Sequence, residues 1–123
     1  MLRCELRSPD RLLFDGEARE VSARSGRGPF TILPQHAALV VALEPGLVRI
    51  GTPDGVRRFA CIGGTLVVDE DRVQISSPEA VPVEEIDLQA VRAQASDASG
   101  PPEERQRIAV RLAALERAVE GRV

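Results

Sequence analysis

Lysine, asparagine, tyrosine and tryptophan are absent from this chain of 123 residues, and histidine occurs once. All 16 basic residues are therefore arginine, and the aromatic residues are only Phe14, Phe30 and Phe59. Three scattered rings do not make a base-stacking platform. The formal net charge is −3, without a block of like charges, which gives no electrostatic reason to bind polyanions. We therefore expect no nucleic-acid partner and no direct lipid anchor.

Long apolar segments are also missing. No apolar run approaches the roughly 18 residues that a membrane-spanning helix needs. The N-terminal segment MLRCELRSPD lacks the apolar stretch of a signal peptide. Cys4 and Cys61 lie in apolar-leaning segments, so we expect both thiols to be buried and reduced in a cytosolic protein. A disulfide between them is the less favoured alternative.

Motifs typical of catalytic, metal-binding or phosphate-binding sites are equally sparse. His36 has no serine or cysteine motif near it, and no serine lies in a GxSxG pattern. One histidine and two distant cysteines do not supply zinc spacing, and DED at 69–71 lacks the other ligands of a calcium loop. SGRG and IGGT do not match phosphate-binding glycine patterns. We therefore expect no catalytic residue, no metal and no cofactor, and we interpret His36 as a residue of a turn.

Residues 2–77 show the pattern of short strands. Leu2, Cys4 and Leu6 alternate with charged residues, which is typical of a half-buried strand. Further strand-like runs are RLLF, EAREVSA, PFTIL, ALVVAL, GLVRI, VRRFACI, TLVV and RVQIS. Turn signals separate them, namely SPD, SGRG, EPG, TPDG, GG and DED. This pattern predicts an N-terminal antiparallel flattened β-sandwich or barrel over residues 1–83.

The composition changes after Ser77. SSPEAVPVEE contains two prolines and no sustained alternation, which predicts a linker. Asp87 is placed to cap a helix from Leu88 to Ala95, in which Leu88, Val91 and Ala95 share one face.

PPEE at 101–104 then predicts the start of a second helix, because proline fits the first turn and acids favour the helix N-terminus. In this helix Ile108, Leu112, Leu115 and Val119 form one narrow apolar stripe. We therefore predict a C-terminal two-helix hairpin over residues 84–123. It has so little apolar surface that it must pack on the sandwich or on a partner.

Two long segments, FDGEAREVSARSGRGPFTILPQHAALVVALEPGLVRI and FACIGGTLVVDEDRVQI, resemble the epsilon subunit of rotary F-type ATP synthases, called delta in mitochondria. The order of sandwich, linker and hairpin is also similar, so the resemblance covers nearly the whole chain. Its most specific fragments are Phe14 to Gly16 with Val21 and Ser22, then Phe30, Ile32 to Pro34, His36 and Ala37, then Pro45 and Gly46, and finally Gly63, Gly64, Leu66 and Val68.

The resemblance implies a non-catalytic subunit of the central rotor stalk of a proton- or sodium-driven ATP synthase. Such a subunit couples rotation of the c-ring to the catalytic head through the gamma subunit, and ATP synthesis belongs to the complex. The implied partners are gamma, the c-ring subunits and, when the hairpin extends, the alpha and beta subunits of the head. In many members the extended hairpin inhibits ATP hydrolysis. The implied location is the cytoplasmic face of the bacterial inner membrane, as a peripheral part of the complex.

The resemblance also suggests contact residues for the c-ring or gamma. His36 matches the histidine that follows the family's ILPGH turn, at the end of the sandwich that faces the c-ring. Gln35 stands where the family often has glycine, so we expect this turn to avoid positive φ. Pro29 stands where the family often has an acidic residue for the basic c-ring loop, and Arg27 is nearby. The candidates are Arg27, Pro29, Gln35 and His36.

Many bacterial members bind ATP in the hairpin through a motif [IL]DxxRA. The nearest match here is LQAVRA, starting at Leu88, with glutamine in the place of aspartate. We therefore expect no tight ATP binding. Candidates for a weak phosphate contact are Arg92, Arg105 and Arg111. The alternative is a solvent-exposed face with pairs such as Glu103 with Arg107, each worth about 0.2–0.5 kcal/mol.

Two other functions fit the sequence. One is a free-standing sandwich module that binds a nucleotide or small metabolite, and the other is a small hydrolase. A ligand-binding module would have a concave pocket with converging polar groups. A stalk subunit would instead expose apolar surface where it meets its neighbours.

Overall fold

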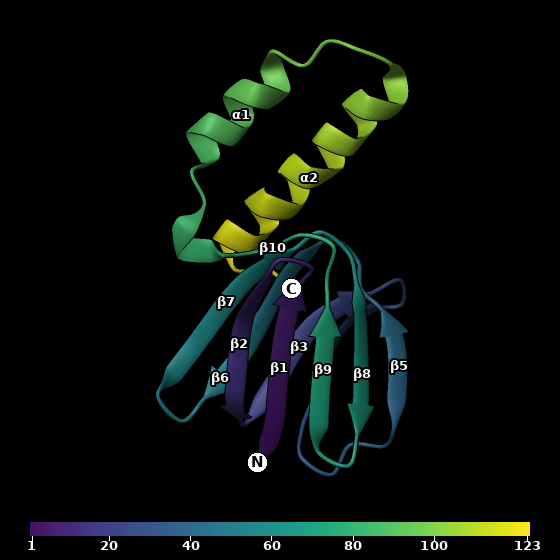
Figure 1. Cartoon of the computed structure of the whole chain (residues 1–123), viewed down its shortest axis with the longest axis vertical. Helices are drawn as coiled ribbons and strands as arrows, with labels where there is room; N and C mark the ends of the chain where they lie inside the picture. Colours follow the sequence, from purple (N-terminus) through teal and green to yellow (C-terminus); the bar gives the residue numbers. More distant parts are fainter.

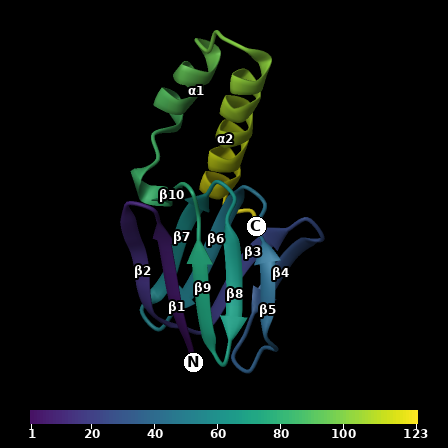
Figure 2. The same cartoon turned by 45° about the vertical axis from the view of Figure 1, so that its right-hand side comes forward.

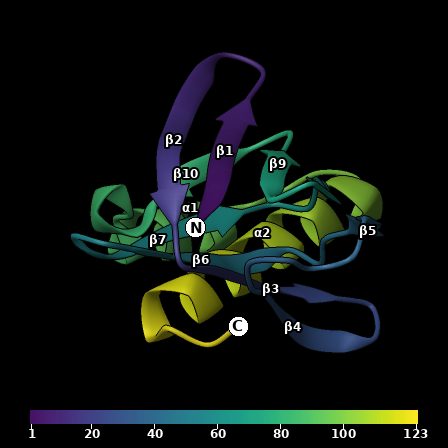
Figure 3. The same cartoon turned by 90° about the horizontal axis from the view of Figure 1, so that it is seen from below.

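Ten strands form two five-stranded sheets that pack face to face (Figures 1 and 3). The computed structural model describes residues 1–123. The first sheet has the order β2-β1-β9-β8-β5 and the second β10-β7-β6-β3-β4. All pairs are antiparallel except β1 with β9. The strands are β1 (Leu2–Ser8), β2 (Arg11–Ala18), β3 (Glu20–Ser25), β4 (Gly28–Ile32), β5 (Leu39–Ala42), β6 (Gly46–Thr52), β7 (Gly55–Cys61), β8 (Thr65–Asp69), β9 (Arg72–Ser76) and β10 (Ala80–Pro82). The predicted sandwich is confirmed.

Alternating side chains from both sheets fill the main core between them. Leu2, Cys4 and Leu6 of β1 are buried, as their spacing predicts, and so are Leu66 and Val68 of β8. The core cluster contains 16 buried residues. Both cysteines belong to it and are free thiols, and burial is the main cause that raises the pKa of each to about 12.

The structure confirms one predicted turn and corrects one predicted division between strands. DED forms the tip of the β8–β9 hairpin, where Glu70 and Asp71 both have positive φ, at 47° and 64°. The sequence pattern predicts RLLF and EAREVSA as two separate strands. This division is wrong, because β2 continues to Ala18 while paired with β1, and the break falls at Arg19.

The predicted linker after Ser77 is in part a strand, which corrects the prediction. Ala80–Pro82 forms β10, which pairs with Phe59–Cys61 of β7. Pro82 is compatible with this position because β10 is an edge strand. A 3₁₀ turn, η1 (Val83–Glu85), follows and leads the chain away from the sheet.

Two helices form the predicted hairpin, which lies at one end of the sandwich, opposite the N-terminus (Figure 1). They are α1 (Leu88–Ser96) and α2 (Pro102–Glu120). Asp87 caps α1, since its Oδ1 accepts a hydrogen bond from the Ala90 N–H at 3.2 Å. Gly121, at φ 80°, ends α2 in the left-handed conformation. Neither helix is long and apolar enough to cross a membrane.

The C-terminal half of α2 packs on the outer face of the second sheet, where it forms a separate small core. Leu115 and Ala118 of α2 are buried against Leu47 of β6 and Ala60 of β7. The predicted stripe is therefore only partly correct: Leu115 is buried, whereas Val119 is 42% exposed. The small side chains of Ala114 and Ala118 let α2 approach the sheet closely, so these two residues are buried and Val119 is not.

Candidate functional site

One open side of the sandwich carries the candidate contact residues of the N-terminal region. β4 is the edge strand of the second sheet and β5 is the edge strand of the first, and both lie on the same side (Figure 2). Neither has a strand partner on its outer edge. A groove of about 550 Å³ runs between them, and Arg27, Pro29 and His36 are among its lining residues. We call this surface the β4–β5 side.

The four candidates lie at two different ends of β4. Arg27 is in the β3–β4 turn, at the end of the sandwich that carries the hairpin, and Pro29 follows it in β4. Gln35 and His36 are in the loop between β4 and β5, at the end of the sandwich away from the hairpin (Figure 2). The structure therefore brings Arg27, Pro29 and His36 to one groove but does not gather the four residues into one cluster.

The loop after β4 is fixed by hydrogen bonds. His36 Nδ1 lies 2.7 Å from the carbonyl oxygen of Ala37, and the His36 N–H donates to the Leu33 carbonyl oxygen at 3.2 Å. The imidazole is half-buried and contacts its own loop, which fits a loop-shaping role.

Gln35 contradicts the sequence prediction, because it adopts positive φ, at 66°. Its backbone N–H donates to Oδ1 of Asp71 at 2.6 Å, so the carboxylate of the β8–β9 turn holds the conformation that glycine would adopt freely. The turn thus keeps a left-handed residue without glycine.

Exposed apolar side chains mark this side as well. Val40 of β5 is 71% exposed and Leu33 is 53% exposed, and Val40 lines the groove. Large aliphatic side chains beside two unpaired strand edges favour a protein interface. Sequence reasoning missed both residues, because an apolar residue in a strand-like run is normally assigned to the core.

The hairpin arginines lie apart from this side, and two of the three have carboxylate partners. Arg111 Nε lies 2.8 Å from Glu79 Oε2, and Arg92 Nη2 lies 3.0 Å from Glu116 Oε2. Arg105 is exposed and forms no ion pair. The predicted alternative of Glu103–Arg107 pairing is also absent, since these side chains form no ion pair in the structure.

A further ion pair joins the sandwich to the connection before α1. Both guanidinium Nη atoms of Arg11, at the start of β2, lie 3.2 Å from the two carboxylate oxygens of Glu85 in η1. The hydrogen bond from Arg11 is the main cause that lowers the pKa of Glu85, and the same bond raises the pKa of Arg11. The two residues are 74 positions apart, so the local sequence pattern does not indicate that they pair.

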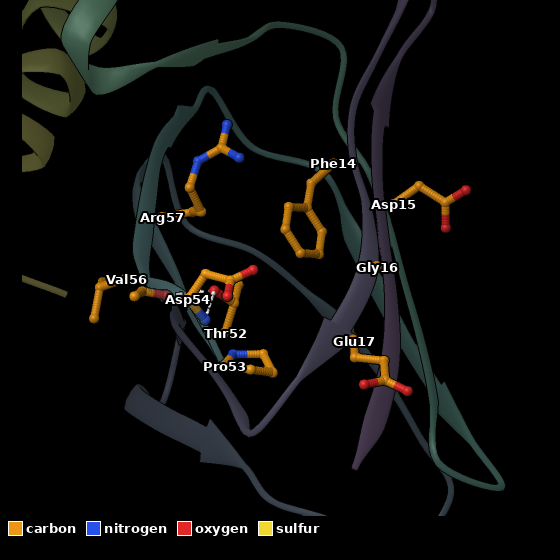
Figure 4. A pocket seen from close by; sticks show the side chains of 10 residues that line it. Phe14, Asp15, Gly16, Glu17, Thr52, Pro53, Asp54, Val56 and Arg57 are labelled. Atoms are coloured by element: carbon orange, nitrogen blue, oxygen red, sulfur yellow. Dashed lines mark hydrogen bonds between the residues drawn. The ribbon is translucent and has the colours of Figure 1, made fainter.

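The opposite open side of the sandwich holds a second cleft, between β2 and the β6–β7 hairpin (Figure 4). Phe14 is directed into this space, whereas Asp15 points away from it. The Arg57 guanidinium lies 5.9 Å from the Phe14 ring centroid and 5.3 Å from that of Phe59. Phe14, the first residue of the FDG fragment, therefore has a structural role: it closes the edge of the core.

The sequence also matches a known protein family. The family described as "ATP synthase, Delta/Epsilon chain, beta-sandwich domain" matches residues 1–83. The chain belongs to the ATP synthase delta/epsilon family. Its resemblance to epsilon subunits is thereby confirmed. Gly64 of the GG fragment has a structural reason in this chain, because a Cβ there would clash with the Ser76 carbonyl oxygen.

Curated relatives agree with the assignment. The chain is 38% identical to the ATP synthase epsilon chain of Synechococcus sp. (strain WH7803) over 103 residues, which are 77% of this chain and 75% of the relative. It is 37% identical to that of Stenotrophomonas maltophilia (strain K279a) over 92 residues, 74% of this chain and 66% of the relative.

Among solved structures, a chain of the Euglena gracilis mitochondrial ATP synthase, in an OSCP/F1/c-ring structure, matches with a TM-score of 0.73 and 25% identity, covering 98% of this chain and 79% of that one. A chain of the Tetrahymena thermophila mitochondrial ATP synthase central stalk and c-ring matches with a TM-score of 0.70 and 14% identity, covering 99% and 96%. The second match supports the fold alone.

Proposed function

We propose that the chain is the epsilon-like rotor subunit of an F-type ATP synthase, in which it couples c-ring rotation to the catalytic head through gamma. The β4–β5 side supports this proposal most directly, because two unpaired strand edges and the exposed Val40 need a protein cover. Family membership and the F1/c-ring neighbour support the same complex.

Within this proposal the β4–β5 side contacts gamma, and the loop with Gln35 and His36 contacts the c-ring. Arg27 and Pro29 lie at the other end of β4 and contact gamma only. Catalysis in this proposal belongs to the complex, and His36 serves to shape its loop, where its ring contacts the Ala37 carbonyl oxygen. The proposed location is the cytoplasmic face of the bacterial inner membrane, as a peripheral part of the complex.

We also propose that residues 1–83 are the coupling unit and residues 84–123 the regulatory unit. The two have separate cores, and the hairpin core is small, which suits an element with two docking states. When the hairpin leaves the sandwich it contacts the alpha and beta subunits and inhibits ATP hydrolysis.

Co-purification tests the assembly. Tagged wild-type chain is isolated from its native membranes, and we expect gamma, alpha, beta and c-ring subunits to accompany it. Val40→Glu is expected to reduce the recovery of gamma, because it introduces a charge on the exposed apolar surface. Val56→Glu is the matched control, since Val56 is 48% exposed on the opposite open side.

Recovery of none of these subunits with the wild type would overturn the assignment and favour a free-standing module. Equal loss of gamma with Val40→Glu and Val56→Glu would overturn the role of the β4–β5 side. A chain ending at Ser77 cannot test inhibition cleanly, because it also lacks β10. A stop after Glu85 keeps the sandwich complete and should abolish inhibition of hydrolysis.

A further inference from the structure

The ion pairs of the chain are concentrated around the hairpin. There are six in the structure, and three of them tie the hairpin and its connection together. Arg11–Glu85 joins β2 to η1, Glu79–Arg111 joins the segment before β10 to α2, and Arg92–Glu116 joins α1 to α2. Two of these pairs join the hairpin or its connection to the sandwich, and the third joins the two helices of the hairpin to each other.

Arg111 lies at the centre of this arrangement. It is on the same side of α2 as Leu115, one turn earlier, and its guanidinium lies beside a cavity of about 320 Å³ between α1, α2 and the connection. The carboxylates that line this cavity are those of Glu79, Glu85 and Asp87, and Arg111 is its only cationic lining residue. Arg11 neutralises Glu85 from outside the cavity, so the lining keeps an excess of negative charge at Asp87.

A nucleotide in this cavity would compete with carboxylates of the chain. Its phosphates would have to displace Glu79 from Arg111 and would then lie beside the remaining carboxylates, which repel them. Arg92 is directed to Glu116, so it is also engaged by a carboxylate of the chain. Asp87 is committed as the cap of α1.

We infer that Glu79 forms an internal latch, which holds α2 on the sandwich by engaging Arg111 without a nucleotide, while Glu116 ties α1 to α2 through Arg92. Docking is then controlled by these carboxylates and by the apolar contact of Leu115, and it weakens as salt screens the pairs. The inference deepens the proposed regulatory role of the hairpin and rests on it for its biological meaning.

Hydrogen exchange of the isolated full chain measures the latch, because α2 is only marginally stable as a helix once it leaves the sheet, so the amides of residues 114–118 exchange faster when the hairpin opens. We expect Glu79→Gln and Arg111→Gln each to raise their exchange rate about two- to fivefold, the effect of losing one partly exposed ion pair. The double variant should add nothing further, since each single change removes the same pair. Glu84→Gln is the control, because Glu84 is an exposed carboxylate without an ion pair.

MgATP is the ligand probe. We expect millimolar MgATP to leave the exchange of residues 114–118 unchanged in the wild type. Slower exchange with MgATP that disappears in Arg111→Gln would overturn the inference and establish a nucleotide site. Unchanged exchange in Glu79→Gln, or an equal increase in Glu84→Gln, would overturn the latch. No other subunit is present in this measurement, so its failure is distinguishable from a failure of the co-purification.

Discussion

The sandwich and the hairpin differ in how they are held. The sandwich encloses a cluster of 16 buried residues between two sheets, whereas the hairpin shares a cluster of four with the outer face of one sheet. Strands β6 and β7 serve both, since Phe59 faces the main core and its neighbour Ala60 faces the hairpin. One sheet can thus remain a rigid platform while the element on its outer face is released.

The largest effect is expected from a change in the main core. Phe59 is fully buried and packs edge-on against Phe14 with ring centroids 6.4 Å apart. Phe59→Ala should lower the free energy of unfolding by about 3–5 kcal/mol, because it leaves a cavity between the sheets. Urea unfolding followed by circular dichroism measures this loss. Phe59→Leu, which keeps most of the volume, should cost less than about 1.5 kcal/mol; equal losses would mean that the site collapses around alanine.

The matching change in the hairpin core should act on the hairpin alone. Leu115→Ala is expected to weaken docking by about 2–4 kcal/mol, since Leu115 is the only large α2 side chain that is fully buried there. Hydrogen exchange should rise in α1 and α2 while the amides of β6 and β7 stay protected. Val119→Ala is the control and should have almost no effect, as Val119 is exposed.

A fall in protection across the whole sandwich in Leu115→Ala would contradict this comparison, because it would show that the two cores unfold together. A large effect of Val119→Ala would instead mean that the apolar stripe predicted from the sequence describes the docked face after all.

The sandwich could be predicted well from the sequence because strand burial repeats every second residue. Leu2, Cys4 and Leu6 specify both the strand and its buried face. What could not be predicted was the role of β10, since Ala80–Pro82 has no alternation and is held only by its pairing with β7. The sequence pattern indicates which side chains are buried, but it does not indicate the sheet edge with which a short segment pairs.

The positions of the candidate site residues were harder to predict. Gln35 adopts positive φ because Asp71, which is distant in sequence, accepts its N–H. Glu79 and Glu85 likewise find their arginine partners only through the fold. In α2, helical periodicity located an apolar stripe, but the close approach of the sheet selected the face rich in alanine. Each miss involves a contact between distant segments, for which local pattern gives no signal.

The two cysteines allow the main core to be tested by pH. Each thiol has a pKa of about 12 in the fold against 9.0 in an ordinary setting, so the unfolded chain loses these protons first as the pH rises. Stability is thus complete below pH 9.0 and falls above it, by about 1.4 kcal/mol per cysteine at one pH unit higher. The absence of lysine and tyrosine makes the cysteines the main side chains that titrate there. Urea unfolding at pH 8 and 10 should show this slope in the wild type.

The control for this pH dependence is the double variant Cys4→Ala with Cys61→Ala, which should be less stable at pH 8 but nearly independent of pH up to 10. An equally steep alkaline loss in the double variant would show that the thiols are not its cause. The hairpin core contains no cysteine. We therefore expect the protection of its amides to fall at high pH only if the sandwich itself is destabilised.

The smallest effect that we predict concerns the junction between the two regions. Asp87 caps α1 through the Ala90 N–H, and Asp87→Ala should cost the helix about 1 kcal/mol. Because α1 contributes no buried residue, this loss should appear as faster exchange within α1 and leave urea unfolding of the sandwich unchanged. Asp87→Asn retains an acceptor for the cap and should behave like the wild type. If Asp87→Asn is as harmful as Asp87→Ala, the negative charge of Asp87, in the cavity that Arg111 also lines, stabilises the junction between sandwich and hairpin, and the hydrogen bond of the cap is not the main contribution.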